Sequence, residues 1–100
     1  MASGERYTEI LKHFQRGLDF FEGGFLDDAI NELTMAISLA ETHDTTKAST
    51  SLIYNARGGT AYLQGKFSEA IADFEMALRL DPDNVECIDN IAAAKQARGW

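Results

Sequence analysis

The sequence repeats itself at an offset of 41 positions, and this duplication constrains the fold more than any other feature of the chain. At that offset Gly17 aligns with Gly58 and Gly24 aligns with Gly65 without a gap. Apolar positions align as well: Leu11 with Leu52, Phe21 with Tyr62, Ala29 with Ala70, Leu33 with Phe74, and Ala36 with Ala77. Two unrelated amphipathic helices would not also share both glycines. The chain therefore contains a duplicated unit, which is typical of repeat architectures.

Each unit is predicted to be a helical hairpin. In the second unit Ala70, Phe74 and Ala77 recur at helical spacing, and Asp81-Pro82 ends the pattern because proline cannot continue a helix. The glycines at the aligned turns fit a short antiparallel connection. After the proline, Asp83 with Glu86 resembles a capping box before a last helix. The predicted helices span about 7–22, 26–40, 46–63, 67–80 and 84–98.

Gly17 and Gly58 fall in the middle of predicted helices, where glycine costs about 1 kcal/mol relative to alanine. We interpret this cost as a sign of a close helix crossing in each hairpin. The large aromatic residues of the stripes are predicted to fill the core, namely Phe20, Phe67 and Phe74.

The chain has 100 residues, and we expect one all-α domain over residues 1–100. Its net charge is -7, and its nine Lys and Arg residues are scattered singly along the sequence. Nucleic acids and anionic membranes need a clustered positive surface, so neither is an expected partner. A peptide that is basic at one end suits this charge better.

Cys87 is the only cysteine, so the sequence offers no internal disulfide and no cluster of thiolate ligands. We interpret it as a half-buried structural residue. No apolar run approaches the roughly 20 residues of a membrane span, and no signal peptide is evident. We therefore expect a protein of the cytoplasm, or of the nucleus, that is neither secreted nor anchored.

The second unit resembles a tetratricopeptide repeat, a 34-residue helix-turn-helix, over residues 51–84. The positions that carry the resemblance are Tyr54, Gly58, Tyr62, Gly65, Phe67, Ala70, Phe74, Ala77 and Pro82. The first unit, about 7–43, fits more loosely and has no terminal proline. The resemblance implies a right-handed superhelix of two hairpins with a capping helix at about 84–98. The seven residues by which 41 exceeds 34 equal about two helical turns, so the flanking helices can lengthen without rotating their apolar faces.

In this family the first helix of each hairpin lines a groove that binds a peptide or a helix. Carried over by position, the resemblance implies a partner-binding groove made of Leu11, Phe14, Leu18, Phe21, Leu52, Asn55, Gly59, Tyr62, Leu63, Glu86 and Asn90. Some family members hold the carboxylate of a chaperone peptide with Lys, Arg and Asn side chains at five positions. Here these positions are Phe14, Leu18, Ala56, Glu86 and Asn90. Because a carboxylate needs charged donors, we predict no binding of that kind.

The sequence offers no catalytic constellation, so we predict that the chain is not an enzyme and needs no cofactor. Gly59 to Lys66 imitates a phosphate loop, but five residues separate the two glycines and no Ser or Thr follows the lysine. His13 and His43 lack a nearby cysteine or second histidine, so we predict surface histidines and no metal site.

These observations favour a non-catalytic adaptor that holds a peptide or an amphipathic helix in the groove. Phe14, Leu18, Phe21 and Tyr62 are its predicted apolar anchors. The alternative is a structural subunit or homo-oligomer whose groove is filled by another copy of the chain.

Overall fold

The structure is a computed structural model, which describes residues 2–43 and 45–99, with side chains described from residue 7 onward. Helices joined by short connections make up the described chain. They are α1 (Ala2–Glu22), α2 (Leu26–Thr42), α3 (Lys47–Leu63), α4 (Phe67–Leu80) and α5 (Val85–Arg98). The all-α hairpin arrangement predicted from the duplication is confirmed.

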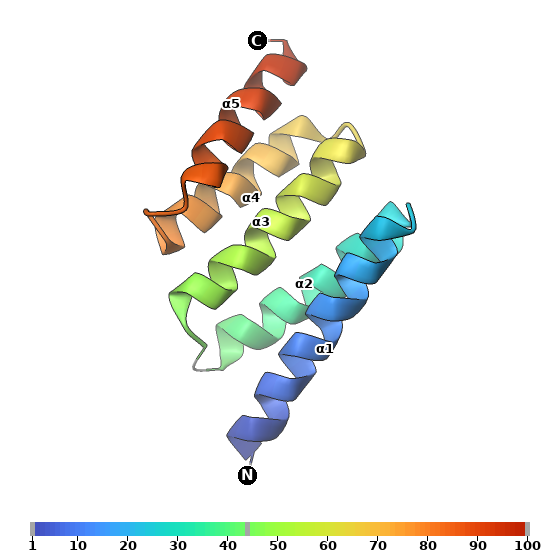
Figure 1. Ribbon diagram of the computed structural model, residues 1–100, viewed down its shortest axis with the longest axis vertical. Helices are drawn as coiled ribbons and strands as arrows, with labels where there is room; N and C mark the ends of the chain where they lie inside the picture. Colours follow the sequence, from blue (N-terminus) through green and yellow to red (C-terminus); the bar gives the residue numbers. More distant parts are fainter. Residues whose placement is uncertain (1, 44, 100) are drawn as a thin grey trace.

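The helices lie in two layers (Figure 1). Helices α1, α3 and α5 form the nearer layer, and α2 and α4 lie behind them. The Cα atoms extend over 48 × 30 × 17 Å, and the shortest of these dimensions is the depth of the two layers. The first helix of every hairpin is therefore on one face of the molecule, and the second helices are on the other.

The helix bounds agree with the predicted ones within two residues, except that α1 begins at Ala2 instead of about residue 7. The structure also explains the long period. Helix α2 continues three residues beyond Leu39, the equivalent of the last residue of α4. Helix α3 begins four residues before Ser51, the equivalent of the first residue of α5. The seven extra residues are thus additional helix, as the sequence predicted.

Gly17 and Gly58 mark the close crossings of the two hairpins, as predicted. A Cβ atom on Gly58 would lie 2.7 Å from Cε1 of Phe74 and 3.2 Å from the carbonyl oxygen of Ala70. A Cβ atom on Gly17 would lie 2.7 Å from Cγ of Leu33. The large side chain of the second helix occupies the space that each glycine leaves free.

The core consists of two clusters of buried side chains. The first joins the two hairpins and contains Leu33, Ile37, Ile53, Tyr54 and Cys87 among its members. The second lies between α3, α4 and α5, around Phe74, with Ala61, Ala70, Ile71 and Ala94. Phe74 is buried as predicted, whereas Phe20 and Phe67 are only partly buried.

Three predictions about single residues are corrected by the structure. His13 is buried, because it packs between α1 and α2 with its Nδ1 atom 2.7 Å from Oε1 of Glu32. Cys87 is fully buried instead of half-buried, and burial, followed by Glu86 and Asp81, raises the pKa of its thiol. Among the described residues, no side chain caps α5, so the capping box at Asp83 does not form.

The structure also bears on membrane and metal sites. Within residues 2–43 and 45–99, no helix combines the length and apolar character needed to cross a membrane. The same residues hold no group of three His, Cys, Asp or Glu side chains placed to bind a metal ion.

Candidate functional site

The face made by α1, α3 and α5 carries the predicted groove residues, and we call it the groove face. On α1 it presents one apolar stripe, because Tyr7, Leu11, Phe14, Leu18 and Phe21 recur at intervals of three and four residues. Tyr7, Leu11 and Phe21 are exposed, whereas Phe14 and Leu18 are partly buried. The other side of α1 is committed to the hairpin through Ile10, His13 and Gly17, which are buried.

Helix α3 continues the groove face at the centre of the molecule. Leu52 and Leu63 stand out near its two ends, with 55% and 56% of their surfaces exposed. Between them Asn55, Gly59 and Tyr62 are partly buried. The ring of Tyr62 packs edge-on against Phe67, the first residue of α4, at a centroid distance of 5.4 Å.

A pocket of about 220 Å³ opens between α3 and α5. It is lined by Gly59 and Tyr62 of α3, Phe74 of α4, and Asn90 and Ala93 of α5. The absence of a side chain at Gly59 creates this space, since no described atom of another element lies within 4 Å of where its Cβ would be. Three predicted groove residues, Gly59, Tyr62 and Asn90, therefore meet around one cavity whose wall includes the buried ring of Phe74.

Beside this pocket, two asparagines link α3 to α5. Oδ1 of Asn55 accepts a hydrogen bond from Nδ2 of Asn90 at 3.1 Å, and the thiol of Cys87 lies 3.5 Å from the same oxygen. Within the part of the chain that the structure describes, the NH2 group of Asn55 and the amide oxygen of Asn90 make no other hydrogen bond, so both can bond to a partner. A donor and an acceptor side by side suit a polypeptide backbone, which offers one of each per residue.

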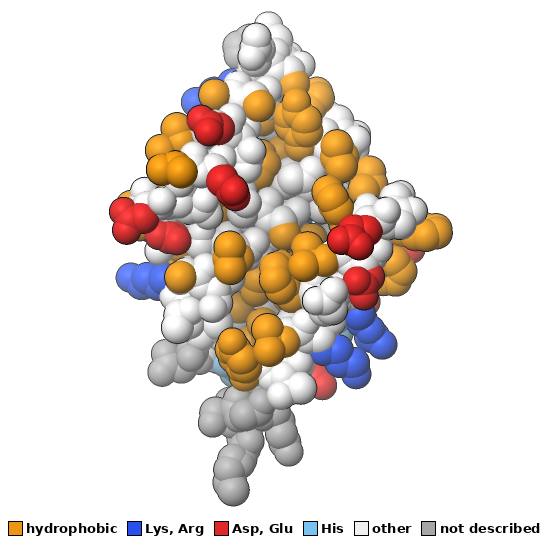
Figure 2. Space-filling model, viewed as in Figure 1, with side chains coloured by type: hydrophobic (Ala, Val, Ile, Leu, Met, Phe, Trp, Pro, Cys, Tyr) orange, Lys and Arg blue, Asp and Glu red, His pale blue; other side chains and the backbone are white. Residues whose placement is uncertain are grey.

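The groove face differs in character from one end to the other. Figure 2 shows hydrophobic side chains over α1 and α3, and acidic side chains over α5 and also at the right-hand edge of this view. Glu86 and Asp89 are exposed on α5, and none of the eleven predicted groove residues is Lys or Arg. The α5 end of the groove face therefore attracts positive charge.

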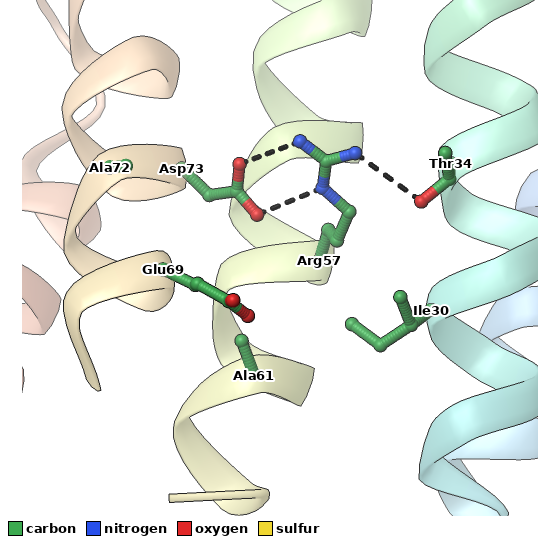
Figure 3. A pocket seen from close by; sticks show the side chains of 7 residues that line it. All are labelled: Ile30, Thr34, Arg57, Ala61, Glu69, Ala72 and Asp73. Carbon is green, nitrogen blue, oxygen red and sulfur yellow. Dashed lines mark hydrogen bonds and ion pairs between the residues drawn. The ribbon is translucent and has the colours of Figure 1, made fainter. Parts of the chain in front are cut away.

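A second cavity, of about 350 Å³, lies on the opposite face between the two hairpins. Figure 3 shows Arg57 reaching from α3 toward α4 and α2. Its Nε and Nη2 atoms donate to the two carboxylate oxygens of Asp73 at 2.9 and 2.8 Å, and Nη1 donates to Oγ1 of Thr34 at 3.3 Å. The hydrogen bond with Asp73 raises the pKa of Arg57. Arg57 and Asp73 neutralise each other's charge and fill each other's hydrogen-bonding groups, so we assign this pair a structural role.

Tyr54 also joins the hairpins, because its hydroxyl group donates to Oε1 of Glu41 at the end of α2. Burial, followed by the hydrogen bond and the negative charge of Glu41, raises the pKa of Tyr54 to about 12. The Arg57 guanidinium lies 5.5 Å from the centre of the Tyr54 ring.

Sequence reasoning missed the cross-helix pairs. Asn55 and Asn90 were predicted to face the groove, but not to bond to each other. Arg57 and Asp73 are 16 residues apart and lie on different helices of the second hairpin. The hairpin geometry contains a signal for this pair, because Arg57 adjoins Gly58 and Asp73 adjoins Phe74, the two residues that meet at the helix crossing.

Comparisons with known proteins agree with this architecture. Residues 51–84 match the family model described as tetratricopeptide repeat. One solved structure is described as the first TPR of Spaghetti (RPAP3) bound to HSP90 peptide SRMEEVD. It resembles this chain with a TM-score of 0.80 and 20% sequence identity, over 92% of this chain and 68% of that one. A search of curated proteins finds no match.

The family match coincides with the hairpin of α3 and α4, and the structural likeness extends over most of the chain. The chain therefore carries a tetratricopeptide repeat at residues 51–84 and has the fold of a tetratricopeptide-repeat domain.

Proposed function

We propose that this chain is a non-catalytic protein-interaction module that holds a peptide or an amphipathic helix against its groove face. The observation that carries the proposal is the pocket between α3 and α5, lined by Gly59, Tyr62 and Phe74. It has room for one apolar side chain, and the Asn55 and Asn90 amides beside it suit the backbone next to that side chain.

The rest of the groove face supports an extended contact. The exposed Leu52 and Leu63 lie on the same helix as the pocket, and the stripe on α1 adds Phe14, Leu18 and Phe21. A partner that places apolar side chains along this surface removes them from water at about 25 cal/mol per Å². Glu86 and Asp89 favour a partner with basic residues near its pocket-binding side chain.

The same side chains argue against an acidic carboxy-terminal peptide as ligand. The RPAP3 structure is described with the HSP90 peptide SRMEEVD, which carries three acidic side chains and a terminal carboxylate. At the corresponding positions this chain has Phe14, Leu18, Ala56, Glu86 and Asn90, of which only Asn90 offers a hydrogen-bond donor and Glu86 repels an anion. We propose that this chain does not hold such a peptide.

The proposed groove is tested by selecting peptides that bind wild type from a displayed library of random peptides. Peptides that also bind the Gly59→Leu variant are removed. A leucine side chain at this position fills the pocket, and its Cβ meets no described atom of another element within 4 Å. Circular dichroism checks that the variant remains folded. We expect wild type to enrich peptides with one aliphatic or aromatic anchor and at least one basic residue, and Gly59→Leu to bind them about tenfold more weakly or worse.

A matched pair of surface variants controls this experiment. Leu63→Ser removes an apolar side chain from the groove face, and Met35→Ser removes one of similar exposure from α2, on the other layer. Only Leu63→Ser is expected to weaken the enriched peptides. If no peptide is enriched, or if Gly59→Leu binds as wild type does, the proposed groove is wrong.

The HSP90 peptide SRMEEVD is the probe for the carboxylate question. Fluorescence anisotropy of the labelled peptide is expected to show no saturable binding to wild type. Saturable micromolar binding that disappears when the terminal carboxylate is amidated would contradict this part of the proposal.

The second candidate is a homo-oligomer, which the exposed Tyr7, Leu11 and Phe21 on α1 favour. In that case another copy of the chain would cover the stripe on α1. Light scattering at micromolar concentration measures the mass of the particle and separates the two candidates. An oligomer that becomes a monomer in the Leu11→Ser variant supports the homo-oligomer.

A further inference from the structure

Two asparagine side chains on the groove face each keep a hydrogen-bonding group that the described chain does not use. Nδ2 of Asn90 donates to Oδ1 of Asn55 at 3.1 Å, and this bond links α5 to α3. Within residues 2–43 and 45–99, the NH2 group of Asn55 and the amide oxygen of Asn90 form no hydrogen bond. An unused donor on α3 and an unused acceptor on α5 therefore lie beside the groove pocket, which Asn90 lines.

These two groups discriminate between the backbone conformations of a ligand. In a helix the interior N–H and C=O groups bond to each other, the first turn leaves only N–H groups over, and the last turn leaves only C=O groups. A carboxy-terminal carboxylate offers acceptors alone. An extended chain presents the N–H and the C=O group of one residue to the same side. Of these ligands, only an extended segment satisfies the donor and the acceptor together.

We propose that the groove binds an extended, internal segment of a partner protein, and that this segment carries a basic side chain a few residues from its apolar anchor. The anchor enters the pocket beside Gly59. An adjacent residue donates its N–H to Oδ1 of Asn90 and accepts from Nδ2 of Asn55. The basic side chain lies over Leu52 and Glu86. The proposal rests on the function proposed for the groove, and it goes beyond that function by excluding a helix and the end of a chain as the ligand.

Helices α3 and α5 bring these contacts into one line. They run in the same direction in Figure 1. An offset of 34 residues aligns Leu52 with Glu86 and Gly59 with Ala93, and the second pair lines the pocket together. The two levels are seven residues apart on each helix, which corresponds to about 10 Å along the helix axes. The bonded asparagines lie between them, so the segment passes an acidic level, the asparagines and the pocket in this order.

The level of Leu52 and Glu86 suits a lysine or arginine side chain. Leu52 is 55% exposed and offers an apolar surface to the aliphatic stem, and Glu86 is exposed and offers its carboxylate to the charged head. Asp89, also exposed, adds a second negative charge on α5. Neither acid forms an ion pair with another described residue. A second copy of this chain, with its net charge of -7, suits this level less well than a basic partner does.

The length of this line determines how far apart the two anchoring side chains are in the ligand sequence. An extended chain covers about 10 Å in about three residues, whereas a helix needs about seven. Because a lysine side chain is long and flexible, a basic residue about two to four positions from the apolar anchor reaches Glu86. The ligand is therefore expected to have this short spacing between its basic and apolar residues.

Two displayed peptide libraries test the conformation of the ligand. Both fix one leucine and one lysine and leave the other positions random. In the near library the lysine is about two to four positions from the leucine, and in the far library it is about seven positions away. We expect wild type to enrich the near library at least about tenfold over the far library. Enrichment of neither library would contradict the groove itself, whereas equal or stronger enrichment of the far library would leave the groove standing and overturn the extended ligand.

Removing single N–H groups from an enriched near peptide locates the backbone contact. Replacing one backbone amide at a time with an ester deletes an N–H group and keeps the shape of the chain. We expect one position beside the leucine to lose affinity for wild type by about fivefold or more. The same ester is expected to cost much less in Asn90→Ala, because the acceptor is already absent. A peptide with no sensitive position, or an equal loss in both proteins, would overturn the bond to Asn90.

A matched pair of charge variants locates the basic side chain. Glu86→Gln removes an exposed acid from the groove face, and Glu75→Gln removes one from α4 on the other layer. Only Glu86→Gln is expected to weaken the near peptide, by about threefold to tenfold, and Glu86→Lys is expected to prefer a peptide whose lysine is replaced by glutamate. Equal binding by wild type and Glu86→Gln would overturn this placement. Circular dichroism checks that each variant remains folded.

Discussion

Two adjacent glycines on α3 have opposite surroundings. Gly58 faces α4 with no room for a Cβ atom, whereas Gly59 faces the open groove pocket. Alanine at position 58 is therefore expected to destabilise the fold by about 1–3 kcal/mol through overpacking. Alanine at position 59 is expected to stabilise it by about 0.5–1 kcal/mol, since glycine within a helix is unfavourable. Urea unfolding of the two variants measures both effects, and equal shifts of the same sign would contradict the packing described.

Tyr54 makes the free energy of unfolding depend on pH in the alkaline range. The pKa of its hydroxyl group is raised to about 12 in the folded chain, compared with about 10 for an exposed tyrosine. Because the folded state keeps the proton longer than the unfolded state, this stabilisation is full below pH 10 and is lost as the pH rises toward 12.

Spectrophotometric titration is expected to show a tyrosine component with a midpoint near pH 12 that Tyr54→Phe removes. The same variant should flatten the fall in stability over that pH window. A wild-type titration without this late component would show that Tyr54 is not buried and bonded to Glu41 as described.

Single buried residues were the hardest to predict. His13 and Cys87 look like ordinary helix residues in the sequence, and their burial depends on which side of each helix meets the neighbouring hairpin. Gly17 and Gly58 were predictable because an unfavourable residue in a helix needs a packing reason.

At the scale of elements, α3 packs against both α2 and α4, and one of its side chains hydrogen-bonds to both of these helices. Arg57 bonds to Asp73 of α4 and to Thr34 of α2. Asp73→Asn removes the charge that compensates a largely buried guanidinium, so it is expected to cost about 2–4 kcal/mol. Thermal unfolding measures this loss.

A double-mutant cycle with Arg57→Met and Asp73→Leu isolates the pair. The double variant is expected to be more stable than the sum of the two single effects predicts, because neither charge is left alone. Additive effects would mean that Arg57 and Asp73 contribute independently.

The helices themselves were largely predictable. The hydrophobic period, the glycines at the turns and the proline after α4 predict the bounds of four of the five helices to within two residues. Helix ends that depend on local bonds were less predictable. Thr46 caps α3 through a hydrogen bond from the backbone N–H of Ser49, but the similar pattern at Asp83 forms no cap because Asp81 to Asn84 make a turn.

At the scale of the whole molecule, stacking two hairpins and α5 places the first helices side by side, so the groove face is shared by α1, α3 and α5. The sequence placed the predicted groove residues on the first helix of each hairpin and on α5 by their repeat positions. It did not predict the pocket, because that cavity depends on Gly59, Phe74 and Ala93 meeting across three helices.

The central claim is that a partner binds on the groove face at the pocket beside Gly59. Titration of isotope-labelled protein with a library-selected peptide, followed by amide chemical shifts, tests it most directly. The account predicts the largest shifts at Asn55, Gly59 and Asn90, and it predicts that the shifts at Asn55 and Asn90 are lost in the Gly59→Leu variant. Shifts confined to α2 and α4, or unchanged in that variant, would contradict it.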